Sequence, residues 1–221
     1  MKQRLSLFLL LTLSLWAADF WQTKPYTEWT DKDTQRMLSS SPWAHEVELM
    51  MGGGPSAPTG GPGGGRGRGG PEGDVAPPAT MNFMVRWRTA LPMKQALARL
   101  KFGKEVANSA EAKTFLDHEE TTYMIGISGL PAVMMAGPEE QWKNALKSVT
   151  ALSVKGKGLL APSEVQITPN NKTIDVTFSF PRTAPLSLDD KEVEFSTRIG
   201  PMAVQSKFRL KDMVVNGKLE L

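Results

Sequence analysis

A run rich in glycine and proline divides the chain into two unlike parts. The residues from Gly52 to Pro78 include twelve glycines and six prolines among 27 positions, and none is aromatic. Such a composition cannot bury enough apolar surface to offset the entropy of ordering, so we expect residues 52–79 to form a disordered linker. The linker separates an aromatic-rich segment, residues 18–51, from a domain over residues 80–221, whose length suits one globular unit.

The first residues have the pattern of an export signal. Two basic residues precede an uncharged, leucine-rich run over residues 5–16, and the small pair Ala17-Ala18 follows it. A basic start, a short apolar core and small residues at the end are typical of a secretory signal peptide. The apolar run is too short to span a bilayer, which needs about 20 residues. We expect residues 1–17 to be removed, and the protein to be periplasmic or extracellular.

Cysteine content and charge limit what the exported protein can be. The chain has no cysteine, so neither a disulfide nor a lipid-bearing cysteine is expected, and cleavage should leave no stable membrane anchor. The formal net charge is +3, and loss of Lys2 and Arg4 with the signal peptide lowers it further. This charge is too small for a nucleic-acid surface. The motif Arg66-Gly67-Arg68 has no interleaved aromatic residue, so we predict no nucleic-acid partner.

The segment before the linker is crowded with large rings. Thr30 and Asp33 indicate the start of a helix over residues 31–39, and residues 47–50 look extended. A helix of this length is marginal alone, and so few residues cannot form a core. We therefore expect the segment to be ordered by contact with something else. Its rings are Phe20, Trp21, Tyr26, Trp29 and Trp43.

Two docking modes for the aromatic segment are open. The segment can complete the core of residues 80–221, or it can bind a second protein, such as a protein of the cell envelope. The linker favours contact within the chain, because it raises the effective concentration of the two parts. Trp29 and Trp43 are the strongest candidates, because buried tryptophans dominate interface energetics. The full set of candidate protein-docking residues is Trp21, Tyr26, Trp29 and Trp43.

The first half of the later domain combines strands and helices. Residues 81–88 and 121–128 alternate between apolar and polar side chains, which predicts half-buried strands. Helices are expected over residues 92–101, after Asn108 as the N-cap, and over residues 138–149. Phe115 and Leu116 of the second helix are expected to be buried. The residues that mark the other two helices by their spacing are Met93, Leu97, Leu100 and Lys101 in the first and Trp142, Leu146 and Val149 in the last.

From about residue 151 the pattern is entirely that of strands. Gly200-Pro201 separates two alternating runs closely enough for a hairpin, and Asn216-Gly217 is typical of a two-residue hairpin turn. Strands that come in adjacent pairs favour an antiparallel sheet. We therefore predict an α+β fold, in which helices pack on a mainly antiparallel sheet. The expected strands are 150–155, 164–168, 173–180, 191–199 and 202–210.

Catalytic and metal-binding patterns are weak. The chain has only two histidines, His45 and His118. The sequence His118-Glu119-Glu120 lacks the second histidine of a zinc-protease helix, and His45 lies beside the predicted linker, where a rigid catalytic base is unexpected. Ser128 has no nucleophile-elbow spacing around it, and Gly156-Lys157-Gly158 lacks that of a phosphate loop. We therefore predict no catalytic residue, no metal site and no cofactor.

Two stretches of the chain have a recognisable pattern. The first is Trp21-x2-Lys24-Pro25-Tyr26-x2-Trp29, which continues to Met37-Leu38 and Ser41-Pro42-Trp43-Ala44. The second is Phe178-Ser179-Phe180-Pro181-Arg182, followed by residues 190–195 (DKEVEF), residues 207–213 (KFRLKDM) and Gly217-Lys218-Leu219-Glu220-Leu221. Together they resemble a family of uncharacterised, signal-peptide-bearing exported bacterial proteins. The resemblance implies export and a modular layout, and it implies no activity, ligand or catalytic residue.

Two classes of function are compatible with these observations. The scarcity of catalytic residues, the linker and the docking segment favour an exported binding or structural module of unknown ligand. The alternative is a secreted hydrolase that uses carboxylates. Convergent acids in a deep pocket would favour the enzyme, whereas scattered acids on a shallow surface would favour the module. The candidate carboxylates are Glu119, Glu120, Asp189 and Asp190.

Overall fold

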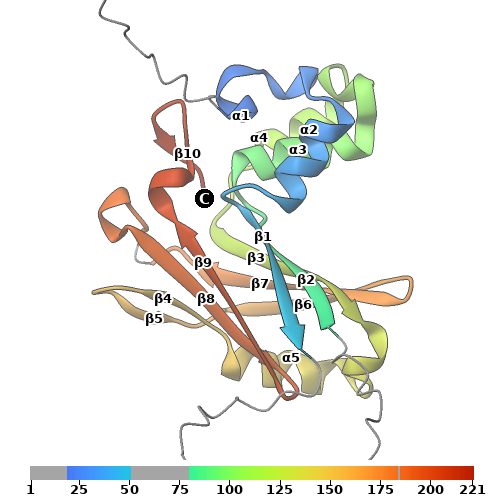
Figure 1. Ribbon diagram of the computed structural model, residues 1–221, viewed down its shortest axis with the longest axis vertical. Coiled ribbons are helices and arrows are strands. Elements are labelled where there is room, and N and C mark those ends of the chain that lie inside the picture. Colours follow the sequence, from blue (N-terminus) through green and yellow to red (C-terminus); the bar gives the residue numbers. More distant parts are fainter. Residues whose placement is uncertain (1–18, 51–79, 184) are drawn as a thin grey trace, which may run out of the picture.

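The computed structural model describes residues 19–50, 80–183 and 185–221. The predicted signal peptide, residues 1–17, and the predicted linker, residues 52–79, lie outside these ranges. The described residues form an α+β fold in which all paired strands are antiparallel (Figure 1). The predicted fold class is therefore confirmed.

Two sheets form the body of the fold. The larger sheet has the strand order β1-β2-β3-β7-β6, the smaller sheet has the order β5-β4-β8-β9, and β10-β11 is a separate hairpin. The strands of the larger sheet are β1 (Ala44–Met50), β2 (Thr80–Trp87), β3 (Thr122–Pro131), β7 (Thr173–Pro181) and β6 (Glu164–Asn170). The others are β5 (Gly158–Leu160), β4 (Ala151–Val154), β8 (Glu192–Ile199), β9 (Met202–Arg209), β10 (Val214–Val215) and β11 (Lys218–Leu219).

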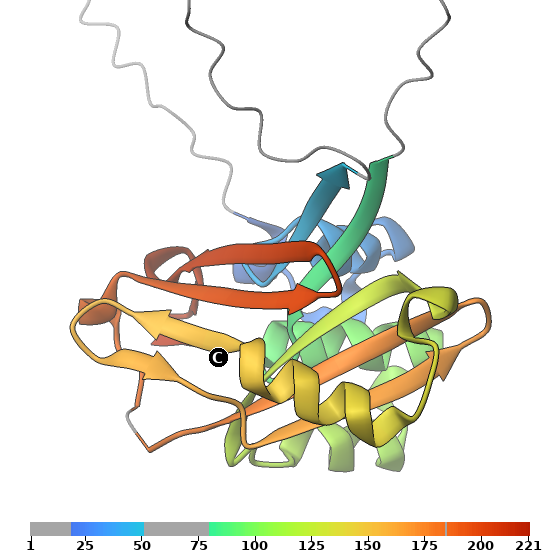
Figure 2. The ribbon, with the colours of Figure 1, turned by 90° about the horizontal axis from the view of Figure 1, so that it is seen from below.

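The helices lie at two places on this body. Figure 1 shows α1 to α4 gathered at one end of the larger sheet, and α5 packs against β6 and β8, one strand from each sheet (Figure 2). The α-helices are α1 (Phe20–Thr23), α2 (Asp31–Ser39), α3 (Leu91–Phe102), α4 (Ala110–Asp117) and α5 (Glu139–Val149). The 3-10 helices are η1 (Tyr26–Glu28), η2 (Gly103–Ala107), η3 (Ala132–Met135), η4 (Leu188–Asp190) and η5 (Leu210–Asp212).

The inward faces of the two sheets share one hydrophobic core. In β2, β8 and β9 every second residue is buried, as the alternating sequences predict. The ring of Phe178 on β7 lies 5.4 Å from that of Phe195 on β8. The ring of Trp87 on β2 lies 5.3 Å from that of Phe208 on β9. These ring contacts hold the larger sheet against the smaller one.

The start of α4 differs from the prediction by one residue. The helix begins at Ala110 and Ser109 caps it, because the Ser109 hydroxyl accepts the backbone N–H of Ala112 at 3.1 Å. Asn108 instead ends the preceding turn, η2. Asparagine and serine are both good N-caps, so the sequence alone does not separate two adjacent candidates.

Phe115, which the sequence predicts to be buried, is exposed, and so are two apolar residues that mark helices by their spacing, Leu100 and Val149. Leu100, Phe115 and Val149 have exposed fractions of 57 %, 39 % and 46 %. Ala98 of α3 and Ala112 of α4 belong to a small buried cluster of their own, so small side chains occupy this contact and the larger ones lie at its margin. Val149 is the last residue of α5.

Candidate functional site

The four aromatic docking candidates lie in or against the core of the same chain. Trp21, Trp29 and Trp43 have exposed fractions of 7 %, 1 % and 0 %, and Tyr26 is partly buried. The indole N–H of Trp43 donates to the backbone oxygen of Glu220 at 2.8 Å, so the segment contacts the far end of the described chain. Binding of a second protein through these four residues stays a prediction.

Strand pairing adds to this docking. β1 pairs along its whole length with β2 and forms the edge of the larger sheet. A strand from the aromatic-rich segment, residues 18–51, therefore belongs to the same sheet as strands of residues 80–221. The predicted extended run, residues 47–50, is part of β1. Thr30 and Asp33 form the predicted cap of α2, with each accepting the backbone N–H of the other. The end of α2 and the start of β1 are thereby fixed beside β9, with which β1 is also in contact.

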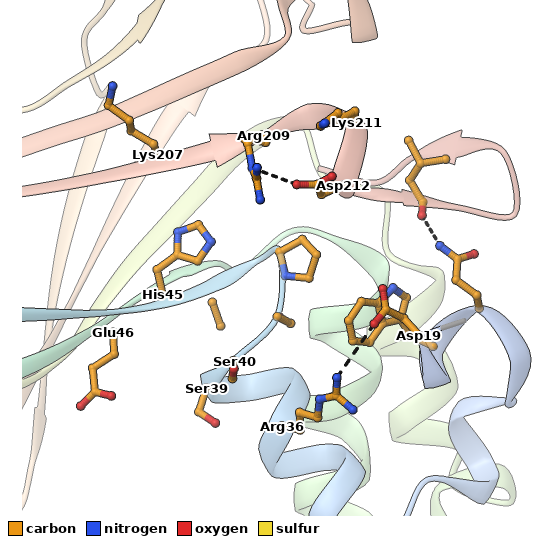
Figure 3. A pocket seen from close by; sticks show the side chains of 16 residues that line it. Asp19, Arg36, Ser39, Ser40, His45, Glu46, Lys207, Arg209, Lys211 and Asp212 are labelled. Carbon is orange, nitrogen blue, oxygen red and sulfur yellow. Dashed lines mark hydrogen bonds and ion pairs between the residues drawn. The ribbon is translucent and has the colours of Figure 1, made fainter. Parts of the chain in front are cut away.

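An open cleft lies between this corner and the end of β9. One wall comes from α2 and the start of β1, and the other from β9 and η5 (Figure 3). The cleft has a volume of about 1050 Å³, and most of its lining side chains are polar or charged. The lining residues are Asp19, Trp21, Gln22, Arg36, Ser39, Ser40, Ser41, Pro42, Ala44, His45, Glu46, Lys207, Arg209, Lys211, Asp212 and Val214.

Cationic side chains enter the cleft from both walls. Figure 3 shows Arg36 of α2 and Arg209 of β9 on opposite sides. The Arg209 guanidinium lies 2.9 Å from the Asp212 carboxylate. Arg36 is 4.0 Å from Asp19, and its side chain is 56 % exposed. Among the described residues Lys211 has no ion pair. Arg36 and Lys211 therefore keep most of their capacity to bind an anionic group from outside.

His45 joins the two walls at one point. Its Nδ1 lies 2.9 Å from the hydroxyl oxygen of Ser206 on β9, and its ring stacks on Phe208 with centroids 4.7 Å apart. Burial, and secondarily the charge of Arg209, lowers the pKa of His45. A neutral histidine beside a serine can act as a catalytic base, but Ser206 is only 5 % exposed and cannot readily reach a substrate. We interpret the pair as a structural contact between β1 and β9.

The lowered pKa of His45 predicts that stability falls on mild acidification. In the unfolded chain His45 should titrate near 6.5, whereas in the folded chain it should titrate at lower pH. The stabilisation is complete above pH 6.5 and is lost as the pH falls toward the folded value, because protons then bind the unfolded state preferentially. We expect His45→Gln to remove this part of the pH dependence in urea unfolding curves. His118→Gln, at an exposed histidine, is the control, and an unchanged profile in His45→Gln would contradict the prediction.

The carboxylates of the hydrolase alternative do not form one site. Glu119 and Asp189 are exposed. Glu120 lies 3.1 Å from Lys94, and Asp190 lies 2.8 Å from Lys157. Burial alone would raise the pKa of Asp190, but hydrogen bonds from Lys157 and from the backbone of Ser187 outweigh it and hold the pKa below 3.8. A general acid needs a raised pKa, so Asp190 is set up as a structural ion-pair partner.

Lys94 provides a test of the structural role of Glu120. Lys94 is 3 % exposed, and it also donates to the backbone oxygen of His118 at 2.7 Å. We expect Lys94→Met to lower the free energy of unfolding by about 3 kcal/mol, because it leaves a half-buried carboxylate unpaired. Lys101→Met breaks an exposed pair with Glu111, so it should cost less than about 1 kcal/mol. Equal losses in the two variants, measured by urea unfolding, would rule out this role.

The other residues considered as a nucleophile or a metal ligand, Ser128 and His118, do not belong to a catalytic or metal site formed by described residues. The Ser128 hydroxyl accepts a hydrogen bond from Arg86. His118 is exposed and its nearest acid is Glu120, at 3.9 Å. Over the described ranges no group of three histidine, cysteine or acidic side chains could hold a metal ion. In the same part of the chain no helix is both long and apolar enough to cross a membrane.

Sequence reasoning did not identify the cleft, although it singled out Trp21 and His45, which line it. Arg36 belongs to no pattern that the sequence singles out, and Arg209 and Lys211 lie in the second stretch of the resemblance, which implies no ligand. The three residues come from opposite ends of the described chain. The available local signal was the exposed basic pair Lys207 and Arg209, two positions apart on one face of a strand. That signal does not reveal that α2 lies opposite, since the packing of α2 and β1 beside β9 is tertiary.

Comparison with known proteins finds no matching family model, no similar curated protein and no similar solved structure. The resemblance to exported bacterial proteins stays a prediction. The geometry and charge of the cleft are therefore the best guide to the function of the protein.

Proposed function

We propose that the protein is an exported binding module, periplasmic or extracellular, that holds a segment of another protein in the cleft between α2–β1 and β9–η5. The character of this cleft carries the proposal. Small-molecule sites are mostly apolar and bury most of their ligand. This cleft is open and is lined mainly by polar and charged side chains, which suits the wet and polar contacts of a protein interface.

Other observations agree with a binding role. The sequence of residues 1–17 supports export, although these residues lie outside the described ranges. The two walls of the cleft are fixed by a ladder, a helix cap and the His45–Ser206 contact, so the cleft is preorganised and binding needs little rearrangement. A hydrolase is less well supported, because Glu119 and Glu120 lie between α4 and β3, apart from Asp189 and Asp190 in η4, so the four candidate acids do not converge.

Site-specific photo-crosslinking in the native envelope tests the proposal. A photoreactive phenylalanine analogue replaces Ser40, an exposed residue on the cleft wall, or Val133 on η3, which is 83 % exposed and does not line the cleft. We expect the probe at Ser40 to capture one or a few proteins that the probe at Val133 does not capture. Crosslinked products that are the same at both positions, or absent from both, would reject the proposed function.

Charge reversal on the cleft walls provides the matched control. Arg36→Glu with Lys211→Glu should abolish the Ser40 crosslinks, because both side chains remain available to an anionic group. Lys113→Glu reverses an exposed charge on α4, outside the cleft, and should leave the crosslinks unchanged. If both changes had the same effect, the contact would depend on overall charge and not on this cleft.

A further inference from the structure

The cleft is bordered by the free edges of both sheets. β1 is the last strand of the larger sheet and β9 is the last strand of the smaller one. In the described residues no ladder joins β1 to β9, although His45 and Ser206 meet at 2.9 Å. Edge strands carry backbone groups without partners in the sheet, and such groups can pair with another chain.

A hydrogen bond at the end of β9 shows which of its backbone groups are free. The N–H of Leu210 donates to the carbonyl of Lys191 at 2.9 Å, and this pair continues the register in which Arg209 lies opposite Glu192. In an antiparallel ladder, residues that bond the neighbouring strand alternate with residues whose N–H and C=O point away from it. The residues of β9 that point away from β8 are therefore Ala203, Gln205, Lys207 and Arg209.

The same reasoning applies to β1. The N–H of Trp87 donates to the carbonyl of Trp43 at 2.8 Å, so in the common register the backbone groups of Ala44, Glu46 and Glu48 point away from β2. Ala44 agrees with this assignment, because its N–H and C=O both bond Ser41 in the preceding turn. Of the residues whose free backbone groups point away from the sheets, Glu46 on β1 and Lys207 and Arg209 on β9 line the same cleft.

β8 already pairs with β9, and it shows which side chains the basic residues of β9 contact across the ladder. The first four residues of β8 alternate acidic and apolar side chains, with Glu192 opposite Arg209 and Glu194 opposite Lys207. Nζ of Lys207 lies 3.4 Å from one of these carboxylates and 3.3 Å from the other. A strand on the free edge of β9 would meet Lys207 and Arg209 from the other side, with Arg36 across the cleft.

We propose that β9 accepts an extended segment of a partner protein as an additional antiparallel strand, and that this segment alternates acidic with apolar residues. The inference rests on the proposed binding function and specifies the partner's chemistry. Backbone hydrogen bonds to Gln205, Lys207 and Arg209 supply affinity, and cross-strand pairs of opposite charge select the sequence. Basic residues on an edge strand can also prevent the edges of two sheets from pairing. Binding experiments distinguish this protective role from recognition of an acidic strand.

Peptide binding to the full mature chain is the first measurement. The probe is a peptide of about ten residues that alternates glutamate and valine, and the controls are its lysine–valine counterpart and a version with two central prolines. We expect the acidic peptide to bind at least about tenfold more tightly than either control, since it alone combines negative charge with the ability to form a strand. Lys207→Gln with Arg209→Gln should weaken binding by about fivefold or more, whereas Lys113→Gln should not.

Amide exchange with the same peptide tests strand addition itself. In the free protein the amides of Ser206 and Phe208 should be protected by β8, and those of Gln205, Lys207 and Arg209 should exchange rapidly. Addition of the acidic peptide should slow these three by about tenfold or more, because they gain partners. Binding without this protection, equal binding of the lysine peptide, or no binding would overturn strand addition. If crosslinking at Ser40 still succeeds, the proposed binding function survives; if it fails, both proposals are wrong.

Discussion

Replacing Trp43 by alanine is expected to lower the free energy of unfolding by about 3–5 kcal/mol. The side chain is fully buried, its ring packs edge-on against Trp21 with centroids 5.8 Å apart, and its N–H satisfies the backbone oxygen of Glu220. The substitution therefore creates a cavity and leaves a buried carbonyl without its donor. Urea unfolding at neutral pH measures the loss.

Two variants show whether the loss comes from this buried position. Trp43→Phe keeps most of the ring volume but removes the donor, so about 1–2 kcal/mol should be lost. Trp142→Ala removes a tryptophan of α5 that is only partly buried and whose N–H bonds an exposed backbone oxygen, that of Ala136, so its cost should also be smaller. A loss for Trp43→Ala no larger than that for Trp142→Ala would contradict the assignment of Trp43 to the core.

The parts of the fold that sequence predicts are those set by local chemistry. Alternation in β2, β8 and β9 was readable because period two places every second side chain on the core face. The turn at Asn216-Gly217 was readable because both residues adopt positive φ, 49° and 79°. Thr30 and Asp33 were readable as a cap because both hydrogen bonds are formed within four residues.

The parts that sequence does not predict depend on distant packing. β5 is a three-residue strand and has no alternating pattern long enough to detect. Phe115 looked buried because its helix is amphipathic, but close contact through alanines decides which face of α4 is covered. The cleft requires residues near 40 and near 210 to meet, and the patterns at these two places imply neither a contact between them nor a ligand. The charges of Lys207 and Arg209 indicate a binding surface only once the strand order places β9 at a free edge of its sheet.

Without residues 18–79, the remaining chain is expected to lose cooperative folding. Trp29, Trp43, Met37 and Leu38 are all buried in the core that they share with the rest of the chain. Burial of each large apolar side chain contributes about 1.5–3 kcal/mol, and whole domains are stable by only about 5–15 kcal/mol. Removing the segment also leaves β2 without β1 on one side. Near-ultraviolet circular dichroism and urea unfolding of residues 80–221 should show loss of fixed packing.

Addition of the missing segment as a separate peptide should restore the fold. A peptide of residues 19–50 contains α1, η1, α2 and β1 but is not covalently linked to residues 80–221. Recovery of the near-ultraviolet signal would therefore show that contact alone orders both parts. The matched control is the same peptide with Trp29→Ala and Trp43→Ala, which should fail because it lacks the two most deeply buried rings. If residues 80–221 were equally stable alone, the tryptophans would not be essential to the core. Their burial would then be reversible docking, and the second mode, exchange with a partner protein, would become the better explanation.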